Sequence, residues 1–210
     1  MASMPPELAG HPDRLRWNAR YSGVVASFAA HPLAGQALPL PLPDGPVLDR
    51  ASGPSGSVLL AAAAGRQVTA VDAAEVALRL LGGEAERRRL SARITLVHAD
   101  LAEWRPEPGR YSLVLCTGYW DRAVFAAAAE SVTAGGLLGW EAFTAAALRR
   151  RPGLSPACCL GPGEPAALLP ASFEVRGQRD LPDRETPAKR RLLARRSQAS
   201  SASSASWPSA

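Results

Sequence analysis

Three aspartates each follow a short apolar stretch in the first half of the chain. Asp49 ends the run VLD, Asp72 ends VTAVD, and Asp100 ends ITLVHAD. Each of them alone is explained as a helix N-cap or a loop acid, because aspartate is common at both positions. Together they predict carboxylates along one edge of a parallel sheet, where open α/β folds bind their ligands.

The loop between the first two aspartates indicates which ligand these carboxylates would meet. Asp72 follows the loop ASGPSGS by about 20 residues, a spacing at which an acid accepts the hydroxyls of a ribose. A dinucleotide loop would repeat its glycines, whereas this chain has Ser55 and Val58 at the corresponding positions. Asp49, ahead of the loop, would also repel a pyrophosphate. The residues therefore favour a cationic, phosphate-free adenosine cofactor, a description that fits S-adenosylmethionine.

The elements that must position these residues alternate between strand and helix patterns. Strands are expected at residues 47–50, 67–71, 94–97, 111–116 and 136–142. Helical patterns begin at residues 13 and 31 and cover residues 55–64, 73–90 and 121–132, with Gly82 and Gly83 interrupting the segment 73–90. Residues 173–180 and 190–195 have no helix between them, so they should pair as an antiparallel hairpin. This order predicts an α/β fold: a doubly wound, mostly parallel seven-stranded sheet with a C-terminal antiparallel hairpin and helices on both faces.

The length of 210 residues fits a single domain with a hydrophobic core. We expect a loose N-terminal lead-in at residues 1–13, one domain at residues 14–197, and a Ser/Ala tail at residues 198–210. The tail lacks the apolar content needed to pack, so we predict that it is disordered.

The chain carries a formal net charge of +5, and much of it lies late in the sequence. The basic residues concerned are Arg184, Lys189, Arg190, Arg191, Arg195 and Arg196. Such a cluster is typical either of a solvated strand edge or of a surface that binds nucleic acid, and we favour the strand edge. Lys189 is the only lysine, so the richness in arginine is also consistent with coding bias.

Cysteine content and hydropathy narrow the cellular setting. The three cysteines form neither an even-numbered disulfide set nor a Cys/His cluster with metal-ligand spacing, so we expect no metal site. The apolar stretch at residues 58–64 is far shorter than the roughly 20 residues that cross a bilayer, and no secretory signal is visible. We therefore expect a cytoplasmic protein that does not contact membranes. For its oligomeric state, we expect a monomer or a homodimer.

The stretch VLDRASGPSGSVLLAAAAGRQVTAVD at residues 47–72 resembles the first two motifs of class I S-adenosylmethionine-dependent methyltransferases. ITLVHADL is similar to their third motif and YSLVLCTGYW to their fourth. With the terminal RRLLARR, the resemblance covers roughly residues 15–197. RWNARY at residues 16–21 also resembles the leading segment of small-molecule methyltransferases of the tellurite-resistance and thiopurine type.

The resemblance implies a site for S-adenosylmethionine, with a Rossmann-like fold around it. Asp49, with the backbone around Ala51 and Gly53, would line the methionine part of the cofactor, and Asp72 would hold the ribose hydroxyls. The family also implies that Ala73 packs beside the adenine, Asp100 receives its amino group and Leu101 covers its ring. Cys116 and Thr117 would face the sulfonium and the substrate. Trp17 and Tyr21 would close over the cofactor from the N-terminal helix. For Trp17 and Tyr21, packing as core aromatics over the sheet is an equal alternative. Ser55 departs from the family's glycine, and Gly56 is expected to supply the missing flexibility.

No residue can be assigned as a catalytic base from the sequence. The candidates near the expected rim of the site are His31, Tyr119, Asp121 and Glu141. Capping or packing is the alternative for His31. For Glu141 the alternative is an acid near a loop whose partner is solvent or an arginine. A base is needed only if the acceptor must lose a proton as it attacks, which thiolates and neutral amines do not require.

The end of the fourth strand and the size of the chain bear on the methyl acceptor. The strand exit reads CTGYW and lacks the Asn-Pro-Pro-Tyr or Asp-Pro-Pro-Tyr of many nucleic-acid and glutamine methyltransferases. The segments left over to cover a substrate are short, which favours a small molecule. We therefore expect an S-adenosylmethionine-dependent methyltransferase that acts on a small-molecule acceptor by in-line displacement. An RNA methyltransferase that uses the arginine-rich end, and a non-catalytic S-adenosylmethionine-binding protein of the same fold, are the alternatives.

Overall fold

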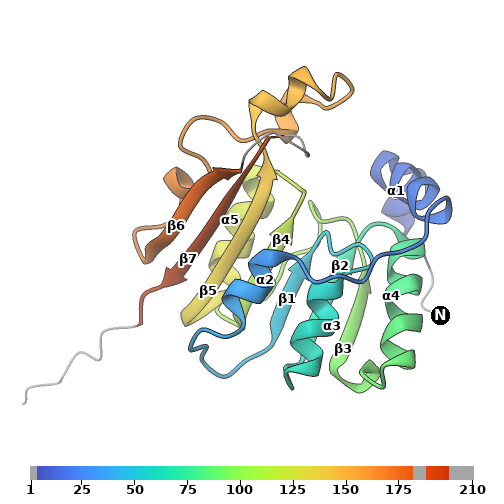
Figure 1. The fold of residues 1–210 in the computed structure, drawn as a ribbon, viewed down its shortest axis with the longest axis horizontal. Coiled ribbons are helices and arrows are strands. Elements are labelled where there is room, and N and C mark those ends of the chain that lie inside the picture. The colour runs from blue at the N-terminus through green and yellow to red at the C-terminus, as the bar shows by residue number, and fades with distance from the viewer. Residues whose placement is uncertain (1–3, 182–187, 199–210) are drawn as a thin grey trace, which may run out of the picture.

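The computed structural model describes residues 4–181 and 188–198, and its centre is one seven-stranded sheet (Figure 1). The strands lie in the order β3-β2-β1-β4-β5-β7-β6. Their bounds are β1 Val47–Arg50, β2 Val68–Asp72, β3 Ile94–His98, β4 Tyr111–Thr117, β5 Val132–Phe143, β6 Phe173–Leu181 and β7 Lys189–Arg196. Strands β1 to β5 pair in parallel, whereas β7 runs antiparallel to both β5 and β6. The predicted fold class and its terminal antiparallel hairpin are confirmed.

Helices cover both faces of the sheet. Their bounds are α1 Pro12–Ser22, α2 Pro32–Ala37, α3 Gly56–Ala63, α4 Glu75–Arg87 and α5 Arg122–Ser131. Helices α2, α3 and α4 lie on one face and α5 on the other, while α1 stands above one end of the sheet (Figure 1). The 3-10 turns η1 Pro6–Leu8, η2 Ser91–Arg93, η3 Ala145–Arg149, η4 Pro156–Cys158 and η5 Ala166–Leu168 join these elements. No helix in the described ranges is long and apolar enough to cross a membrane.

The sheet separates two apolar cores because successive side chains of a strand point to opposite faces. In β1, Val47 packs into the core beneath α2 and α3, and Leu48 packs into the core beneath α5. In β4, Leu113 and Leu115 join the first core while Val114 joins the second. Chain order reverses between β1 and its neighbour β4, and the crevice at such a reversal is where open α/β sheets bind ligands.

Two local expectations differ from the structure. Helix α4 runs without a break through Gly82 and Gly83, although we expected an interruption there. A Cβ at Gly82 would lie 3.2 Å from the Leu96 side chain, so the glycine lets α4 approach β3 closely. The described part of the lead-in, residues 4–13, is packed rather than loose, because Leu8 is fully buried. Except for its first residue, the expected tail lies outside the described residues.

Candidate active site

Ser55 caps the helix that follows the loop between β1 and α3. Its hydroxyl accepts hydrogen bonds from the backbone N–H groups of Ser57 and Val58 at 3.1 and 3.2 Å. The same hydroxyl donates to Asp49 Oδ2 at 2.7 Å. In a dinucleotide-binding loop, the first N–H groups of the helix would face a phosphate. Here a serine side chain satisfies two of them, which agrees with a cofactor that has no phosphate at this position.

The loop itself is held by Asp72 at the end of β2. Asp72 Oδ2 accepts from Gly53 N at 2.8 Å and Oδ1 accepts from Ala74 N at 2.7 Å. Gly53 has φ +58° and Ala51 has φ +50°, so two loop residues occupy the left-handed region. Gly56 plays another part than the expected flexibility: a Cβ there would lie 2.3 Å from the Phe28 carbonyl oxygen, so its role is to leave room for that backbone.

Asp49 and Asp72 form a buried acidic pair at the point where the strand order reverses. Their side chains belong to residues only 4% and 8% exposed, and no ion pair of the described chain involves either one. Burial raises the pKa of Asp49 to about 7, against the opposing hydrogen bond from Ser55 and with a further increase from Asp72. Burial also raises the pKa of Asp72. Two buried carboxylates without a cation would bind a positively charged group favourably.

The aromatic pair of α1 lies over this loop and outside both cores. Trp17 and Tyr21 stack with their centroids 5.6 Å apart. A Cβ added to Gly53 would lie 2.7 Å from the Tyr21 hydroxyl, so this phenol rests directly on the loop. Burial, and next the charge of Asp72, raise the pKa of Tyr21 to about 12, which keeps the phenol protonated. Neither aromatic belongs to a core cluster, so the alternative of core packing is not what the structure shows.

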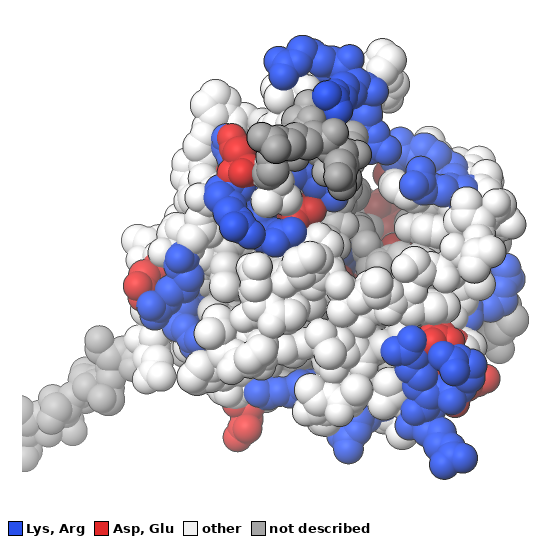
Figure 2. Space-filling model, in the orientation of Figure 1, with Lys and Arg blue, Asp and Glu red and all other residues white. Residues whose placement is uncertain are grey.

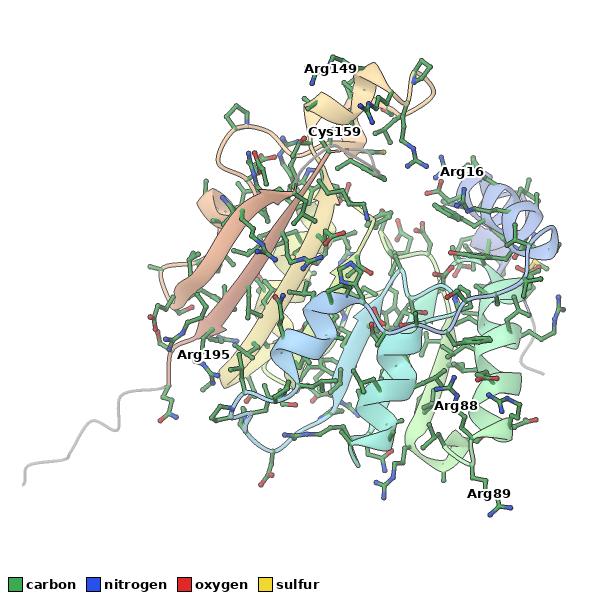
Figure 3. All side chains as sticks on the ribbon, viewed as in Figure 1. Arg16, Arg88, Arg89, Arg149, Cys159 and Arg195 are labelled. Carbon is green, nitrogen blue, oxygen red and sulfur yellow. The ribbon has the colours of Figure 1, made fainter. Side chains whose placement is uncertain are left out.

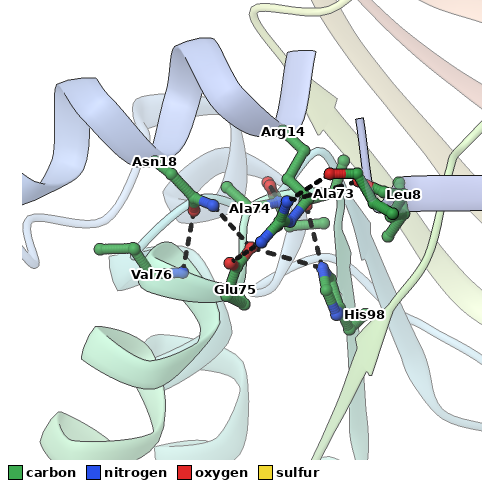
Figure 4. Close-up of polar contacts among 10 residues, drawn as sticks. Leu8, Arg14, Asn18, Ala73, Ala74, Glu75, Val76 and His98 are labelled. Atoms are coloured by element: carbon green, nitrogen blue, oxygen red, sulfur yellow. Dashed lines mark hydrogen bonds and ion pairs between the residues drawn. The ribbon is translucent and has the colours of Figure 1, made fainter. Parts of the chain in front are cut away.

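Helix α1 has no fully buried residue, and a group of polar contacts joins it to α4 (Figure 4). Arg14 forms a bidentate ion pair with Glu75 at the start of α4. Asn18 donates to the same carboxylate at 2.6 Å and accepts from Val76 N at 3.1 Å. His98 Nε2 lies 3.1 Å from the Ala73 carbonyl and 3.6 Å from Glu75, which gives His98 a structural role. Helix α1 is therefore a cover attached to α4 by a network of charged side chains.

Asp100 and its neighbour Leu101 lie in the loop that follows β3. Asp100 Oδ1 accepts from Ala102 N at 3.0 Å, and Asp100 Oδ2 lies 3.8 Å from His11 Nε2. Leu101 is 5% exposed and belongs to the core beneath α5. Arg50, which the sequence analysis did not single out, is fully buried and donates to the Leu101 carbonyl at 3.0 Å. The loop that bears Asp100 is thus fastened to the end of β1.

At the end of β4, some side chains lie in the core and others lie at the rim of the sheet. Cys116 is fully buried in the core beneath α5, where burial raises the pKa of its thiol, so its side chain does not face an open site. Thr117, the next residue, is half-buried at the rim. Trp120 lies in the same core as Cys116, and Tyr119 is packed against it. Asp121 accepts from Val124 N at 2.9 Å and is the N-cap of α5.

At the end of β5, Glu141 is held by three basic side chains. Lys189 Nζ lies 2.9 Å from Oε1 and Arg191 Nη2 lies 2.7 Å from Oε2. His31 Nε2 lies 3.2 Å from Oε1, while His31 Nδ1 accepts from Leu33 N and caps α2. Burial alone would raise the pKa of Glu141, but hydrogen bonds from His31 and Lys189 outweigh it and hold the pKa well below its usual range. Glu141 has basic partners, as its alternative interpretation anticipated.

The molecular surface is hollowed beside α1. Figure 2 shows a depression beside α1 with acidic atoms in its depth and basic side chains around it. In Figure 3, Arg16 of α1 and Arg149 of η3 stand on opposite sides of the open region above the strand ends. Among residues 4–181 and 188–198, no group of His, Cys, Asp and Glu is arranged to hold a metal ion.

Comparison with known proteins agrees with this geometry. Residues 47–136 match the family model described as a methyltransferase domain. The structure resembles geranyl diphosphate C-methyltransferase from Streptomyces coelicolor A3(2), with a TM-score of 0.63 at 12% identity over 93% of this chain and 90% of that chain. It also resembles a protein of echinomycin biosynthesis whose structure concerns the conversion of a disulfide bond into a thioacetal group, with a TM-score of 0.66 at 18% identity over 91% and 94% of the two chains. A 4+2 cyclase, SpnF, has a TM-score of 0.62 at 16% identity over 80% of both chains. No curated protein matched the sequence.

The fold is that of the class I S-adenosylmethionine-dependent methyltransferases. Residues 47–136, which contain the loop, Asp49, Asp72, Asp100 and the end of β4, are the part of the chain that matches the methyltransferase-domain model. The predicted Rossmann-like methyltransferase fold is confirmed.

Three features of the site escaped the sequence analysis. The capping role of Ser55 had a sequence signal, because serine just before a helix is a common N-cap. The link between Arg14, Asn18 and Glu75 had none, since the residues lie about 60 positions apart, as in Arg14 and Glu75 with a separation of 61. For Glu141 the sequence offered an arginine partner only as an alternative, and the pairing of β5 with β7 shows which basic residues contact it.

Proposed function

We propose that this protein is an S-adenosylmethionine-dependent methyltransferase that acts on a small-molecule acceptor. The observation that carries the proposal is the buried pair Asp49 and Asp72, without an ion-pair partner in the described chain, at the reversal of strand order. Such a pair suits a cofactor that combines a cationic amino acid part with a ribose. Asp49 would hold the ammonium group, and Asp72 would accept the ribose hydroxyls with the lone pairs not used by Gly53 N and Ala74 N.

The other residues around the site would confine the ligand. Tyr21 and Trp17 on α1 would cover it, because they already lie over the loop. The Asp100 loop would border the adenine, with Arg50 fixing its backbone from below. Thr117, half-buried at the end of β4, would be the residue of that strand that meets the acceptor. Cys116 would contribute its backbone only, because its side chain is in the core.

The bound cofactor would supply an activated methyl group on a sulfonium. The protein's own contribution would be alignment of acceptor and methyl group, which accounts for large accelerations in such displacements. The four candidate bases are engaged or unsuited. His31 uses both ring nitrogens, Asp121 caps α5, and ion pairs hold Glu141 as a weak base. Burial raises the pKa of Tyr119, so its phenol stays protonated near neutral pH and does not act as a base. This favours an acceptor that attacks without transferring a proton to the enzyme, such as a thiolate or a neutral amine.

Thermal unfolding with S-adenosylhomocysteine, S-adenosylmethionine and NAD tests the proposal. A ligand at about 100 times its dissociation constant should add roughly 2.7 kcal/mol of stability. We expect shifts with the two adenosyl compounds and none with NAD. Asp72→Ala should abolish these shifts, whereas Asp44→Ala, an acid in a loop away from the site, should not. Absence of any adenosyl-dependent shift in the wild-type protein would refute the assignment.

A non-catalytic or differently catalytic protein of the same fold is the second candidate. The similar structure named as a 4+2 cyclase supports it, because the fold serves more than methyl transfer. Binding of S-adenosylmethionine without methyl transfer to any thiol, amine, hydroxyl or RNA acceptor would favour this candidate.

The RNA methyltransferase alternative is less well supported by the arrangement of the basic residues. Arg195 donates to the carbonyls of Pro41 and Gly135, and Arg196 donates to that of Glu130. These contacts lie at the end of β7 opposite to Lys189 and Arg191, so the late cluster does not form one continuous surface. We retain a cytoplasmic setting and a monomeric or homodimeric state as proposals; the three free cysteines support the first.

A further inference from the structure

Basic side chains surround Glu141 where β5 and β7 reach the edge of the sheet that bears the aspartates. Because β7 is antiparallel to β5, its first residues lie beside the last residues of β5. Arg191 pairs in register with Glu141, and Lys189 pairs with Phe143. The start of β7 therefore brings two permanent cations to the carboxyl edge of the parallel strands.

Positive charge exceeds negative charge in this group. Lys189 Nζ and the Arg151 guanidinium lie 5.3 and 4.8 Å from the centroid of the same Phe143 ring. Among the described residues, Glu141 is the one carboxylate in ion-pair contact with Lys189 and Arg191, and no ion pair is formed by Arg151. The side chains of Arg191 and Lys189 are only 10% and 23% exposed, so water compensates their charge incompletely. A bound anion would offset the cost of holding these cations together.

The group is a short distance from the expected position of methyl transfer. Thr117, Glu141 and Arg191 are register partners across β4, β5 and β7, and they lie on one face of the sheet. Neighbouring strands are about 4.8 Å apart, so the backbones of Thr117 and Arg191 are separated by roughly 10 Å. On the other side, His31 N donates to Ser57 Oγ at 3.0 Å and so connects the group to the helix that follows the cofactor loop. A small molecule could span the distance from Thr117 to Arg191.

We infer that the methyl acceptor carries an anionic oxygen group, a carboxylate or a phosphate, and that Lys189 and Arg191 bind this group. The inference rests on the proposed function and adds a substrate class to it. The arginine offers a planar fork for two oxygens, and the lysine adds a compact charge. Glu141 is a positioning residue here, because it contacts both cations and fixes where they point. The anchored group lies away from the reacting atom, so these residues would act mainly on acceptor binding.

Anion binding by the full-length protein tests the inference independently of the cofactor. Thermal unfolding would be followed in low-chloride buffer during titration with inorganic phosphate or with acetate, which separates the two anion types. We expect a saturable stabilisation by at least one of them. Arg191→Gln and Lys189→Met should each raise the dissociation constant of the anion about fivefold or more. Arg176→Gln removes the same charge from exposed β6 and should change this constant less than twofold. Absence of saturable stabilisation, or an equal loss in Arg176→Gln, would overturn the inference.

Glu141→Gln separates anion binding from a purely structural network. Loss of the carboxylate leaves both cations without their counter-charge, so phosphate or acetate should bind severalfold more tightly although the ligand-free protein is less stable. A structural network alone predicts lower stability with no gain in anion affinity, and that result would contradict the inference. Arg191→Lys should retain part of the anion affinity, which controls for misfolding in Arg191→Gln.

Methyl transfer to paired acceptors completes the test. Radiolabelled S-adenosylmethionine would be offered with thiols, amines and hydroxyl compounds in pairs that differ only by a carboxylate or phosphate group. We expect transfer to anionic members, with Arg191→Gln raising KM about tenfold or more and changing kcat little. Equal transfer to neutral members would overturn the inference and leave the proposed function standing. Anion binding without any S-adenosylhomocysteine-dependent shift would refute the proposed function, and with it the role of this group in holding an acceptor. A longer RNA acting in place of the small acceptors would also contradict it.

Discussion

At the scale of single residues, Ser55 illustrates how one side chain can define what a loop accepts. Its hydroxyl accepts two helix N–H groups and donates to Asp49, so it links the cap of α3 to a buried carboxylate. A glycine at this position would leave those N–H groups free for a phosphate. The serine instead leaves the buried carboxylates of Asp49 and Asp72 as the charged groups beside the loop.

Replacement of Ser55 by alanine should therefore destabilise the protein and raise the pKa of Asp49 further. Loss of an N-cap hydroxyl costs about 1 kcal/mol, and Asp49 loses the hydrogen bond that opposes the increase in its pKa. We expect a lower midpoint in urea unfolding with an unchanged slope. Ser52→Ala, which removes only a hydroxyl bonded to its neighbour's carbonyl, is the matched control. Equal midpoints for Ser55→Ala and the wild-type protein would contradict the capping role.

Asp49 also predicts how cofactor affinity depends on pH. A carboxyl group with a pKa of about 7 is mostly protonated at pH 6 and mostly ionised at pH 7.5. If the ionised form binds the cofactor's ammonium group, S-adenosylhomocysteine should bind roughly five- to tenfold more tightly at pH 7.5 than at pH 6. Titration calorimetry in buffers of different ionisation enthalpy should detect proton release on binding at pH 6. Affinity that is flat over this range, or a steep dependence retained in Asp49→Asn, would exclude this residue as the cause.

The positions of the aspartates at the strand ends could be predicted from local sequence, and the directions of several other side chains could not. Asp49 and Asp72 were predictable because strand ends and a small-residue loop are local patterns. Cys116 is one residue away from Thr117, and which of the two faces the core depends on the alternation of β4 in the assembled sheet. Trp120 likewise packs in the core with Phe125 and Trp140. Such outcomes require knowledge of which face each helix covers.

At the scale of elements, α1 differs from every other long helix because it buries no residue. Its amphipathic pattern predicted a helix correctly, but the pattern does not reveal that the helix is fastened by charged contacts. Arg14 and Asn18 both bind Glu75, and their positions four residues apart place them on one side of α1. The helix that covers the site can therefore be loosened without disturbing the core.

Glu75→Ala should release α1 with little effect on the rest of the fold. Cofactor affinity should fall about tenfold, because Trp17 and Tyr21 would no longer be held over the loop, while the main unfolding transition should shift by less than about 1 kcal/mol. Limited proteolysis within residues 12–22, together with calorimetric titration of S-adenosylhomocysteine, provides the measurement. Glu84→Ala removes an acid from the same helix whose partners are Arg87 and Arg88, and it should change neither readout. An unchanged cleavage rate in Glu75→Ala would show that other contacts hold the cover.

The terminal hairpin of β6 and β7 changes the interpretation of the basic cluster late in the sequence. In sequence, its arginines form one basic cluster, and a solvated strand edge is the simplest explanation. In the sheet, the two ends of β7 have different surroundings: Arg195 and Arg196 satisfy backbone carbonyls, whereas Lys189 and Arg191 meet Glu141. The antiparallel direction of one strand separates the two groups.

At the scale of the whole molecule, the acidic residues divide into two groups with opposite effects on stability. Asp49 and Asp72 have raised pKa values because they are buried, so the folded state takes up protons there. For Glu75, burial alone would raise the pKa, but hydrogen bonds from Arg14 and Asn18 lower it to about 2. Ion pairs lower the pKa of Glu141 in the same way. The binding site thus reduces stability near neutral pH, and the contacts that frame it contribute stability there.

The ligand-free protein should therefore be most stable in mildly acidic solution. Glu75 and Glu141 contribute stability that is present above their unfolded pKa of 4.5 and is lost as the pH falls toward 2. Asp49 acts in the opposite sense: its folded pKa lies above its unfolded value of 3.8, so stability falls as the pH rises from about 4 to about 7. The decrease should amount to roughly 2–4 kcal/mol. Urea unfolding should accordingly give a maximum between about pH 4 and pH 5. Asp49→Asn should flatten the decline toward pH 7, and saturating S-adenosylhomocysteine should move the maximum to higher pH. A curve that rises continuously from pH 5 to pH 7.5 without ligand would show that Asp49 is ionised in the free protein, and the site would then have to hold a cation already.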